Sequence, residues 1–421
     1  MPDSPNGSGK TTGDDASSWE YPLSQLKEQQ KLIQQPNLED PGYIRQKASG
    51  KLWVRERLTV LLDEDSFAEV GSVTGKPVYD EESGLLVSFA PANSITGFGR
   101  INGRKVFVTA DDFSVRGGHA DGGIQMKAPY GELLARKARV PLVRLLDGSS
   151  GGGSVATCLS QLFAAGPPVV KQATFEDLSK EALGGWEIHA QNGTVDNVAT
   201  SEQDAFNQIA MFLSYLPSSI FALPPVSESA DPPTRREEEL MSIIPRRRAR
   251  PYDVRRLIRL IVDANGPVDA PSSSSFFEIG ELWGRCIVTG FARLAGRPVG
   301  VLTSDCLVNG GAIDALGSQK SARFATLCDH FGFVTGSVAE RAATIRHGAA
   351  ALSALYNGTM PIYTIIIRRA FGVAGGAFSD LEDGAGTRVA WSVLSPLVSF
   401  VHLGSPPAPG SNGFFSLQAV R

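Results

Sequence analysis

An internal repeat places the strongest constraint on the fold. The segment TGFGRINGRKVFVTADD (Thr96–Asp112) matches TGFARLAGRPVGVLTSD (Thr289–Asp305), which begins 193 residues later. The same separation places Gly117-Gly118 on Gly310-Gly311, Asp121 on Asp314 and Lys127 on Lys320. A single separation maintained without gaps indicates that a segment of the chain was duplicated. The period is too long for the repeats of a solenoid, so each copy is expected to be a whole domain.

Each copy has the same expected order of helices and strands. Upstream of the main match, VRERLTVLLDEDSFAEVG (Val54–Gly71) resembles the two ends of Val254–Gly280. A helix and a short strand lead to two strands joined by a tight turn, at Asn102-Gly103 or Ala295-Gly296, where glycine permits a positive φ. The glycine pair follows, and then a helix, over Gly123–Lys137 in the first copy and Ser318–His330 in the second. This order predicts an α/β protein with two homologous domains.

The two copies are unequally complete. The first continues into an expected buried strand, Val140–Asp147, and the glycine-rich segment Gly148–Ser154. The second passes from Phe331 directly into Gly332, with no strand between them, and then continues with a helix, a strand over Pro361–Ile367 and a glycine-rich turn over Arg368–Phe378. Each half therefore lacks a piece that the other retains.

Charge and composition exclude several classes of protein. The 421 residues carry 40 Lys and Arg against 44 Asp and Glu, and a net charge of −4 argues against a nucleic-acid binder of the basic-patch type. The first twenty residues have neither the apolar run of a signal peptide nor the arginine-rich character of a transit peptide, so a cytoplasmic protein is expected. The four cysteines (Cys158, Cys286, Cys306, Cys328) form no CxxC pair, and no HxxxH pair is present. We expect reduced core thiols and no metal.

Together these segments resemble a known family, the carboxyltransferase (beta) subunits of biotin-dependent acyl-CoA carboxylases of the propionyl-CoA or acetyl-CoA type. The matching segments include KLWVRERLTVLLDEDSFAEVG, ITGFGRINGRKVFVTADDFSVRGGHADG, VPLVRLLDGSSGGGSV, LGGWEIHAQNGTVDN, FLSYLPSS, IIPRRRARPYDVRRLI, TIRHGA and RRAFGVAGGAF. The resemblance implies two crotonase-like domains, each internally shortened here. The expected division is a disordered tail over 1–40, an N-terminal domain over 41–240, a C-terminal domain over 241–391 and an atypical, loosely attached tail over 392–421.

Two departures from the family pattern agree with the repeat comparison. Family members place a long segment between GSSGGGSV and LFAAGPPVV, where this chain has only Ala156–Gln161, and they have a further strand where Phe331 meets Gly332. The carboxyl end after Trp391 also departs from the pattern. We hypothesise that a defective or alternatively spliced gene model produced these junctions.

The resemblance implies transfer of a carboxyl group from carboxybiotin to the α-carbon of a short-chain acyl-CoA. The biotin would be carried by a biotin carboxylase or biotin carboxyl carrier partner, and family members assemble as hexamers. The reaction needs an enolate and a biotin anion to be stabilised, which backbone N–H groups at glycine-rich turns can do without a proton donor. The backbone of Gly372, Val373 and Ala374 is the expected oxyanion hole. Expected substrate contacts are Ser150, Gly151, Gly152, Phe371, Gly375 and Gly376.

Three alternatives remain open at the level of sequence. The chain could be an inactive remnant that retains only partner or CoA binding, because a motif for only one oxyanion hole is visible. Gly148–Gly152 also satisfies the GxSxG pattern of a serine esterase with Ser150 as nucleophile. The basic run Pro245–Arg256 could be either a solvated linker or a contact for CoA phosphates.

Overall fold

The computed structural model describes residues 19–82, 86–118, 126–148, 155–219, 222–232, 234–247, 249–266, 273–328, 362–366, 386–390 and 414–418. The chain divides into two compact units, Met1–Ser150 and Gly151–Arg421. The two compact units are defined by contacts in the structure, whereas the expected domain bounds of 41–240 and 241–391 come from the sequence. The two divisions need not coincide, so the expected bounds stay a prediction. Within the described ranges, no helix is long and apolar enough to cross a lipid bilayer.

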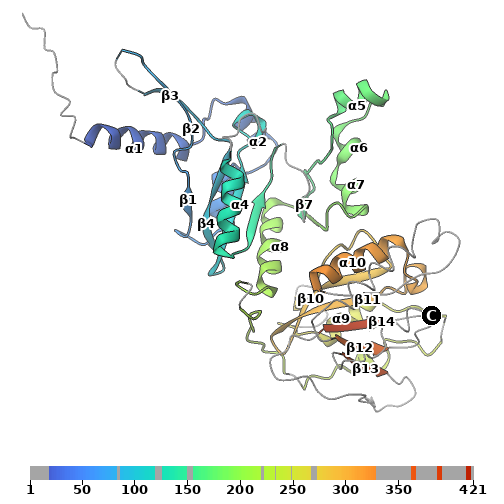
Figure 1. Cartoon of the computed structure of the whole chain (residues 1–421). Helices are drawn as coiled ribbons and strands as arrows, with labels where there is room; N and C mark the ends of the chain where they lie inside the picture. Colours follow the sequence, from blue (N-terminus) through green and yellow to red (C-terminus); the bar gives the residue numbers. More distant parts are fainter. Residues whose placement is uncertain are drawn as a thin grey trace, which may run out of the picture. The chain divides into compact units, whose positions relative to one another are not determined.

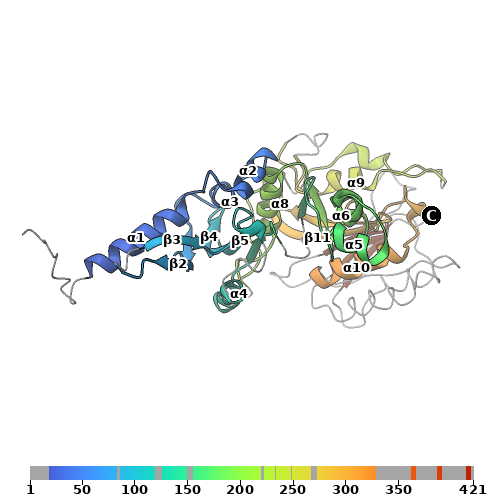
Figure 2. The same cartoon turned by 90° about the horizontal axis from the view of Figure 1, so that it is seen from above.

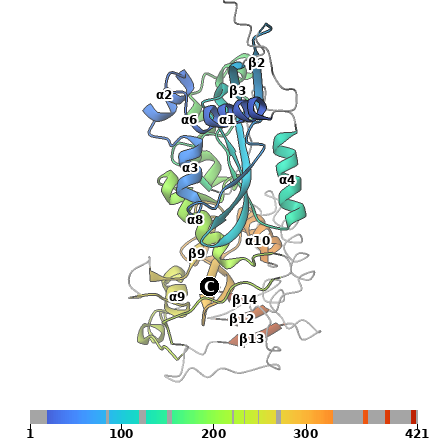
Figure 3. The same cartoon turned by 90° about the vertical axis from the view of Figure 1, so that its left-hand side faces the viewer.

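The first unit is built around a four-stranded sheet of order β1-β4-β5-β6 (Figure 1). Strands β4 and β5 form an antiparallel hairpin, whereas β6 runs parallel to β5. Helices α3 and α4 lie on opposite faces of this sheet (Figure 3). The elements of this unit are α1 (Glu20–Gln34), α2 (Pro41–Ala48), α3 (Val54–Leu61), β1 (Ala68–Val70), β2 (Gly75–Tyr79), β3 (Leu86–Pro91), β4 (Ser94–Ile101), β5 (Arg104–Asp111), η1 (Arg116–Gly118), α4 (Lys127–Ala138) and β6 (Leu142–Leu145).

Two expectations for the first unit need correction. Helix α1 lies inside the segment expected to be disordered, and it lies beside the β2–β3 hairpin (Figure 2). Its glutamine, glutamate, lysine and leucine residues favour a helix, and Arg55 Nε donates a hydrogen bond to the Ile33 carbonyl oxygen at 3.1 Å. The strand expected over Val140–Asp147 is the shorter β6. Only Val143 is buried in it, because β6 forms the edge of the sheet.

The second unit contains a six-stranded sheet of order β13-β12-β14-β11-β10-β9 and a small parallel pair, β7 with β8. Helices α9 and α10 lie on opposite faces of the large sheet (Figures 1 and 2). The elements are β7 (Val155–Thr157), α5 (Pro167–Thr174), α6 (Lys180–Gly184), α7 (Trp186–Gln191), β8 (Asn197–Ala199), α8 (Glu202–Tyr215), η3 (Glu238–Met241), α9 (Val254–Ile261), β9 (Phe277–Glu278), β10 (Ile287–Leu294), β11 (Arg297–Ser304), η5 (Asn309–Gly311), α10 (Ala315–Cys328), β12 (Ile362–Ile366), β13 (Gly386–Ala390) and β14 (Phe414–Gln418).

Alternation along the central hairpin divides the core of the second unit into two clusters. Successive residues of β10 point to opposite faces, as a strand requires. Ile287 and Phe291 join one cluster with Tyr215 of α8 and Phe324 of α10. The neighbouring residues Val288 and Ala292 join the other cluster, with Leu257 and Ile258 of α9 among its members. The sheet is therefore covered on both faces, which explains why almost all of β10 and β11 is buried.

The structure confirms the repeat in backbone detail. The hairpin turns have positive φ at both central residues, 50° and 76° at Asn102 and Gly103, and 48° and 75° at Ala295 and Gly296. Each turn is held by an aspartate that sequence reasoning did not single out. Asp63 accepts hydrogen bonds from the Asn102 and Gly103 amides, and Asp263 accepts them from the Ala295 and Gly296 amides, all between 2.6 and 2.8 Å.

The thiols and the C-terminal segment differ in part from expectation. Cys286 and Cys306 are buried, as expected for core thiols, whereas Cys158 is exposed just after the short edge strand β7. The described part of the C-terminal segment is not loosely attached, because β14 lies between β11 and β12 in the large sheet. The expected strand over Pro361–Ile367 is present as β12. The helix expected after Gly332 lies outside the described residues.

Candidate functional site

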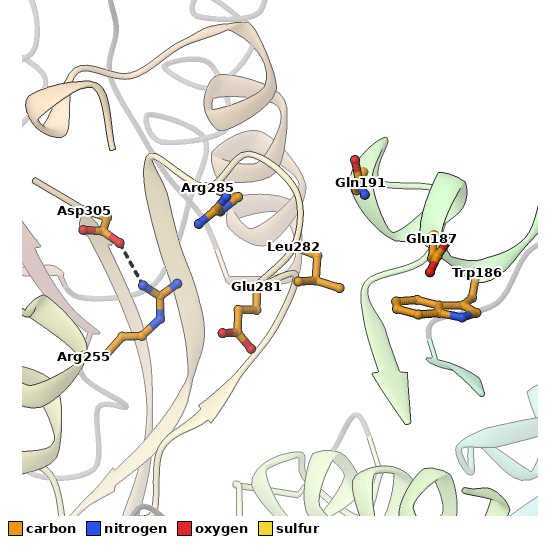
Figure 4. A pocket seen from close by; sticks show the side chains of 8 residues that line it. All are labelled: Trp186, Glu187, Gln191, Arg255, Glu281, Leu282, Arg285 and Asp305. Carbon is orange, nitrogen blue, oxygen red and sulfur yellow. Dashed lines mark hydrogen bonds and ion pairs between the residues drawn. The ribbon is translucent and has the colours of Figure 1, made fainter. Parts of the chain in front are cut away.

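A pocket of about 590 Å³ opens in the second unit, where α7 faces the loop that follows β9 (Figure 4). Trp186 lies on the α7 side, while Leu282 lies on the loop side and is 40% exposed. Charged groups of both signs surround these two apolar side chains. The lining residues are Trp186, Glu187, Gln191, Arg255, Glu281, Leu282, Arg285 and Asp305.

The Arg255 guanidinium lines the pocket and makes three hydrogen bonds to carboxylates. Asp253 caps α9 by accepting a hydrogen bond from the Arg256 amide at 3.0 Å, which fixes Arg255 in the first turn of the helix. The guanidinium donates to Glu278 from Nε at 2.7 Å and from Nη2 at 2.6 Å, and Nη1 donates to Asp305 Oδ2 at 2.8 Å. Burial by itself lowers the pKa of Arg255, but the two carboxylates outweigh it and raise the pKa above its ordinary value.

Lys320 of α10 is a second, deeply buried cation close to this group. Its side chain is 2% exposed, and Nζ donates a hydrogen bond to the Ile287 carbonyl oxygen at 2.7 Å. Burial lowers the pKa of Lys320 to about 8, although the negative charge of Glu278 acts in the opposite direction. The charges of Arg255 and Lys320 thus both act on the half-buried carboxylate of Glu278.

The first unit contains a simpler version of the same arrangement. Arg55 Nη2 donates to Glu69 Oε2 at 3.0 Å, and Lys127 Nζ donates to the Gly71 carbonyl oxygen at 3.3 Å. Burial lowers the pKa of Lys127, as it does that of Lys320. The aspartate that corresponds to Asp305 is Asp112, which accepts a hydrogen bond from Trp53 Nε1 at 3.3 Å instead of from an arginine. Among the described residues, arginine, glutamate and aspartate are joined by hydrogen bonds into one cluster in the second copy, whereas in the first copy Arg55 acts on Asp112 only through its charge.

These contacts change the interpretation of the basic run Pro245–Arg256. Its last two arginines belong to α9, where Arg255 pairs with Glu278 and Asp305 while Arg256 pairs with Glu239 at 2.5 Å. A linker is the wrong description for this end of the run, because the two side chains hold elements of the folded unit together. Their pairing also satisfies the charges that a CoA phosphate would otherwise contact.

The glycine-rich turn of the first unit is a place of close backbone approach. Gly117 and Gly118 have φ of 64° and 68°, and their repeat counterparts Gly310 and Gly311 have φ of 67° and 84°. A Cβ atom on Gly118 would overlap the Asp147 carbonyl oxygen, and one on Gly148 would overlap the Gly118 carbonyl oxygen. The two segments that follow the parallel strands β5 and β6 therefore meet at the carboxyl edge of the sheet, where ligands bind in many α/β proteins.

The expected site residues begin immediately beyond this contact. Ser150, Gly151 and Gly152 come shortly after Gly148 in the sequence and lie outside the described residues. The expected oxyanion turn also lies outside the described residues. Their roles stay predictions. The residues concerned are Ser150, Gly151, Gly152, Phe371, Gly372, Val373, Ala374, Gly375 and Gly376.

Sequence reasoning did not single out the pocket. Trp186 lies in the quoted segment LGGWEIHAQNGTVDN, so its position in a matching segment was a usable signal. Leu282 and Arg285 lie in a loop with no recognisable motif, and only the tertiary structure brings them opposite α7. The described lining residues are charged, amide and apolar side chains. No group of three or more potential metal ligands occurs in the portion of the chain that the structure describes.

Comparison with known proteins gives a consistent result. A family model described as the carboxyl transferase domain matches residues 45–160 and 151–393. The chain is 31% identical to the carboxyltransferase subunit of propionyl-CoA carboxylase from Haloferax mediterranei, over 81% of this chain and 76% of that protein. It is also 31% identical to the human mitochondrial propionyl-CoA carboxylase beta chain, over 81% of this chain and 73% of that one. The alpha subunit of methylmalonyl-CoA decarboxylase from Veillonella parvula is 31% identical, over 82% and 78%.

A solved structure of similar fold is transcarboxylase 12S, described as a hexamer with methylmalonyl-coenzyme A bound. It superposes with a TM-score of 0.75 at 27% identity, covering 89% of this chain and 82% of that chain. A single-chain long-chain acyl-CoA carboxylase shares the fold with a TM-score of 0.69 at 22% identity, covering 87% of this chain and 42% of that chain. These similarities confirm the expected class, an α/β protein with crotonase-like domains.

Proposed function

The chain belongs to the carboxyl transferase domain family and is an acyl-CoA carboxylase carboxyltransferase subunit, and from this premise we propose that it moves a carboxyl group from carboxybiotin to propionyl-CoA or acetyl-CoA. The observation that carries the proposal is the match of the family model from residue 45 to residue 393, which includes both copies of the repeat. Two of the three relatives named above are subunits of propionyl-CoA carboxylases, and the third is a subunit of a methylmalonyl-CoA decarboxylase. The solved relative binds methylmalonyl-CoA, the carboxylated form of propionyl-CoA.

The chemistry requires stabilised anions more than reactive side chains. Removal of the α-proton leaves an enolate on the thioester, which attacks the carboxyl carbon as the bond to the biotin nitrogen breaks. The released ureido anion takes up one proton, which balances the α-proton that the acyl-CoA has lost. We assign the backbone amides of Val373 and Ala374 to one of these oxyanions, with Gly372 making the turn, and substrate contacts to Ser150, Gly151, Gly152, Phe371, Gly375 and Gly376. Biotin enters on a carrier partner, and by analogy with the solved relative six copies of this chain assemble.

The test is a transfer assay with the purified full chain. A carboxylated biotin carrier protein and propionyl-CoA are mixed with the protein, and methylmalonyl-CoA is quantified by mass spectrometry; acetyl-CoA is tested in parallel. Ala374→Pro removes one assigned amide donor, and we expect a loss of about 10²–10³ in kcat, whereas Ala374→Ser keeps the donor and most of the rate. Product formation that is equal in the two variants would exclude this amide from the reaction.

Absence of product from a folded sample would favour an inactive remnant that retains only binding. That outcome is separated from misfolding by measuring CoA binding by calorimetry on the same preparation. The esterase alternative predicts hydrolysis of a p-nitrophenyl ester that Ser150→Ala abolishes. No hydrolysis by the unmodified chain would end that alternative.

A further inference from the structure

The sheet of the first unit provides a template for the second. Its strand order is β1-β4-β5-β6, and the order β9-β10-β11-β14 in the second unit has the same pattern. Three of the four strands correspond through the repeat: β1 to β9, β4 to β10 and β5 to β11. The fourth does not, because β6 follows β5 after a single helix, whereas β14 comes after β12 and β13 in the chain.

The registers of the two fourth strands also agree. In the first unit Val108 is paired with Val143, with the strands parallel. Val301 is the repeat counterpart of Val108, and it is paired with Phe415 of β14, again in parallel. The next positions follow suit: Thr109 and its counterpart Leu302 are paired with Arg144 and Ser416 respectively. Strand β14 thus lies on β11 at the positions and in the direction that β6 occupies on β5.

Strand β14 differs from β6 in having neighbours on both sides. Ser416 is paired with Leu302 of β11 and with Thr364 of β12, so β14 is an inner strand. Every residue of β11 after Arg297 is buried. Water has little access to the β11 backbone, and the N–H and C=O groups on that side of the strand depend on β14 for hydrogen bonds.

We infer that Phe414–Gln418 is a replacement strand, which completes the sheet of the second repeat at the place where the sequence lacks a counterpart of β6. The sequence shows no strand where Phe331 meets Gly332, the position at which the first copy has β6. The strand that lies between β11 and β12 is formed by residues 414–418 of the same chain. The large sheet of the second unit is therefore continuous only when this segment is in place.

Hydrogen–deuterium exchange on the unmodified full chain tests the inference without any substitution. The amides of residues 414–418 are expected to exchange as slowly as those of β11, at least about a hundredfold more slowly than in a synthetic peptide of residues 412–421. Exchange at the rate of the free peptide would overturn the inference. Protection is also expected to be independent of protein concentration. Protection that disappears on dilution would assign the strand to a second copy and overturn the intramolecular arrangement.

A matched pair of variants provides the second measurement. Ser416→Pro removes a backbone N–H from an inner strand, whereas Ser416→Thr keeps it and suits a strand. We expect the proline variant to increase amide exchange in β11 and β12 at least about tenfold while β5 of the first unit is unchanged, and the threonine variant to behave as the unmodified chain. Unchanged exchange of β11 and β12 in Ser416→Pro would overturn the inference. If β5 also becomes exposed, the whole chain has unfolded and the amides of the unmodified chain decide.

Discussion

The Arg255 guanidinium and the Glu278 carboxylate form a bidentate ion pair, with hydrogen bonds of 2.7 and 2.6 Å. In the first unit the corresponding pair, Arg55 with Glu69, is joined by a hydrogen bond of 3.0 Å. Two parallel hydrogen bonds fix both partners more firmly than a single one does. Because Asp305 also accepts from Arg255, this arginine holds the start of α9 against the ends of β9 and β11.

Replacing Arg255 by alanine is expected to lower the free energy of unfolding by about 3 kcal/mol, because one buried and one partly buried carboxylate would be left without their cation. The side chains of Glu278 and Asp305 are only 14% and 3% exposed. The control is Arg285→Ala, which removes an exposed arginine from the same pocket and is expected to change stability by less than about 0.5 kcal/mol. Urea unfolding measures both, and equal effects would contradict the role given to Arg255.

The buried lysine predicts a rise of stability with pH. Since the pKa of Lys320 is lowered to about 8 from an ordinary value of 10.5, the unfolded chain binds this proton more tightly than the folded chain. Between pH 8 and 10.5 the Lys320 contribution to the free energy of unfolding therefore increases with pH, by up to roughly 1.4 kcal/mol per pH unit. At pH 7 Lys320 is protonated in both the folded and the unfolded chain, so burial of its charge lowers the free energy of unfolding by the full amount.

Lys320→Met should remove this contribution, so the stability difference between the unmodified chain and the variant should change over that pH range. The matched control is Lys180→Met, at an exposed position of α6, which should leave the rise intact. A difference between the unmodified chain and Lys320→Met that is constant from pH 7 to 10 would refute the lowered pKa. Denaturant unfolding at fixed ionic strength provides the measurement.

The two hairpin turns allow conformational strain to be separated from steric overlap. Gly103 and Gly296 have nearly the same φ, 76° and 75°, but a Cβ on Gly103 meets nothing within 4 Å, whereas one on Gly296 overlaps the Ser227 carbonyl oxygen. Gly103→Ala is expected to cost about 1–2 kcal/mol from backbone strain alone. Gly296→Ala should cost clearly more, because the Ser227 segment must also move. Thermal unfolding measures the stability of both variants. Equal losses of stability would mean that the Ser227 segment can move aside at no energetic cost.

The thiols should differ in reactivity. Cys158 is exposed, whereas Cys286 is buried, and burial raises the pKa of the Cys286 thiol to about 12. Because the thiolate is the reactive form, iodoacetate should modify Cys158 in the native protein and Cys286 only after unfolding. Peptide mapping by mass spectrometry distinguishes the two sites. If iodoacetate modified Cys286 in the native protein as fast as Cys158, the hydrophobic core of the second unit would have to open easily.

The repeat made much of this fold predictable. The matching segments placed the hairpins β4–β5 and β10–β11, both turns with positive φ, and the helices that became α4 and α10, because alternating apolar residues and turn glycines are local signals. The partners of those elements were less visible. Asp63 and Asp263 cap the turns across 39 and 32 residues of chain, and no spacing rule links an aspartate to a turn at such a distance.

The pocket and β14 show a second limit of sequence reasoning. Trp186 lies in a segment that matches the family, but Leu282 lies in a loop without a motif, and only folding brings the two side chains to the same pocket. The segment Phe414–Gln418 departs from the family pattern and was expected to be loosely attached, but hydrogen bonding in a sheet depends on an available edge more than on ancestry. The expected oxyanion residues follow from the family resemblance, and the transfer assay is their test.

Placing an inner strand so late in the chain has a consequence for biosynthesis. Strand β14 has neighbours on both sides, yet its residues emerge from the ribosome only after those of β11 and β12. The nascent second unit must hold two unpaired strand edges apart until then, whereas the first unit has all four strands of its sheet by residue 145. Chaperone dependence and misassembly during synthesis should accordingly be concentrated in the second half of the protein.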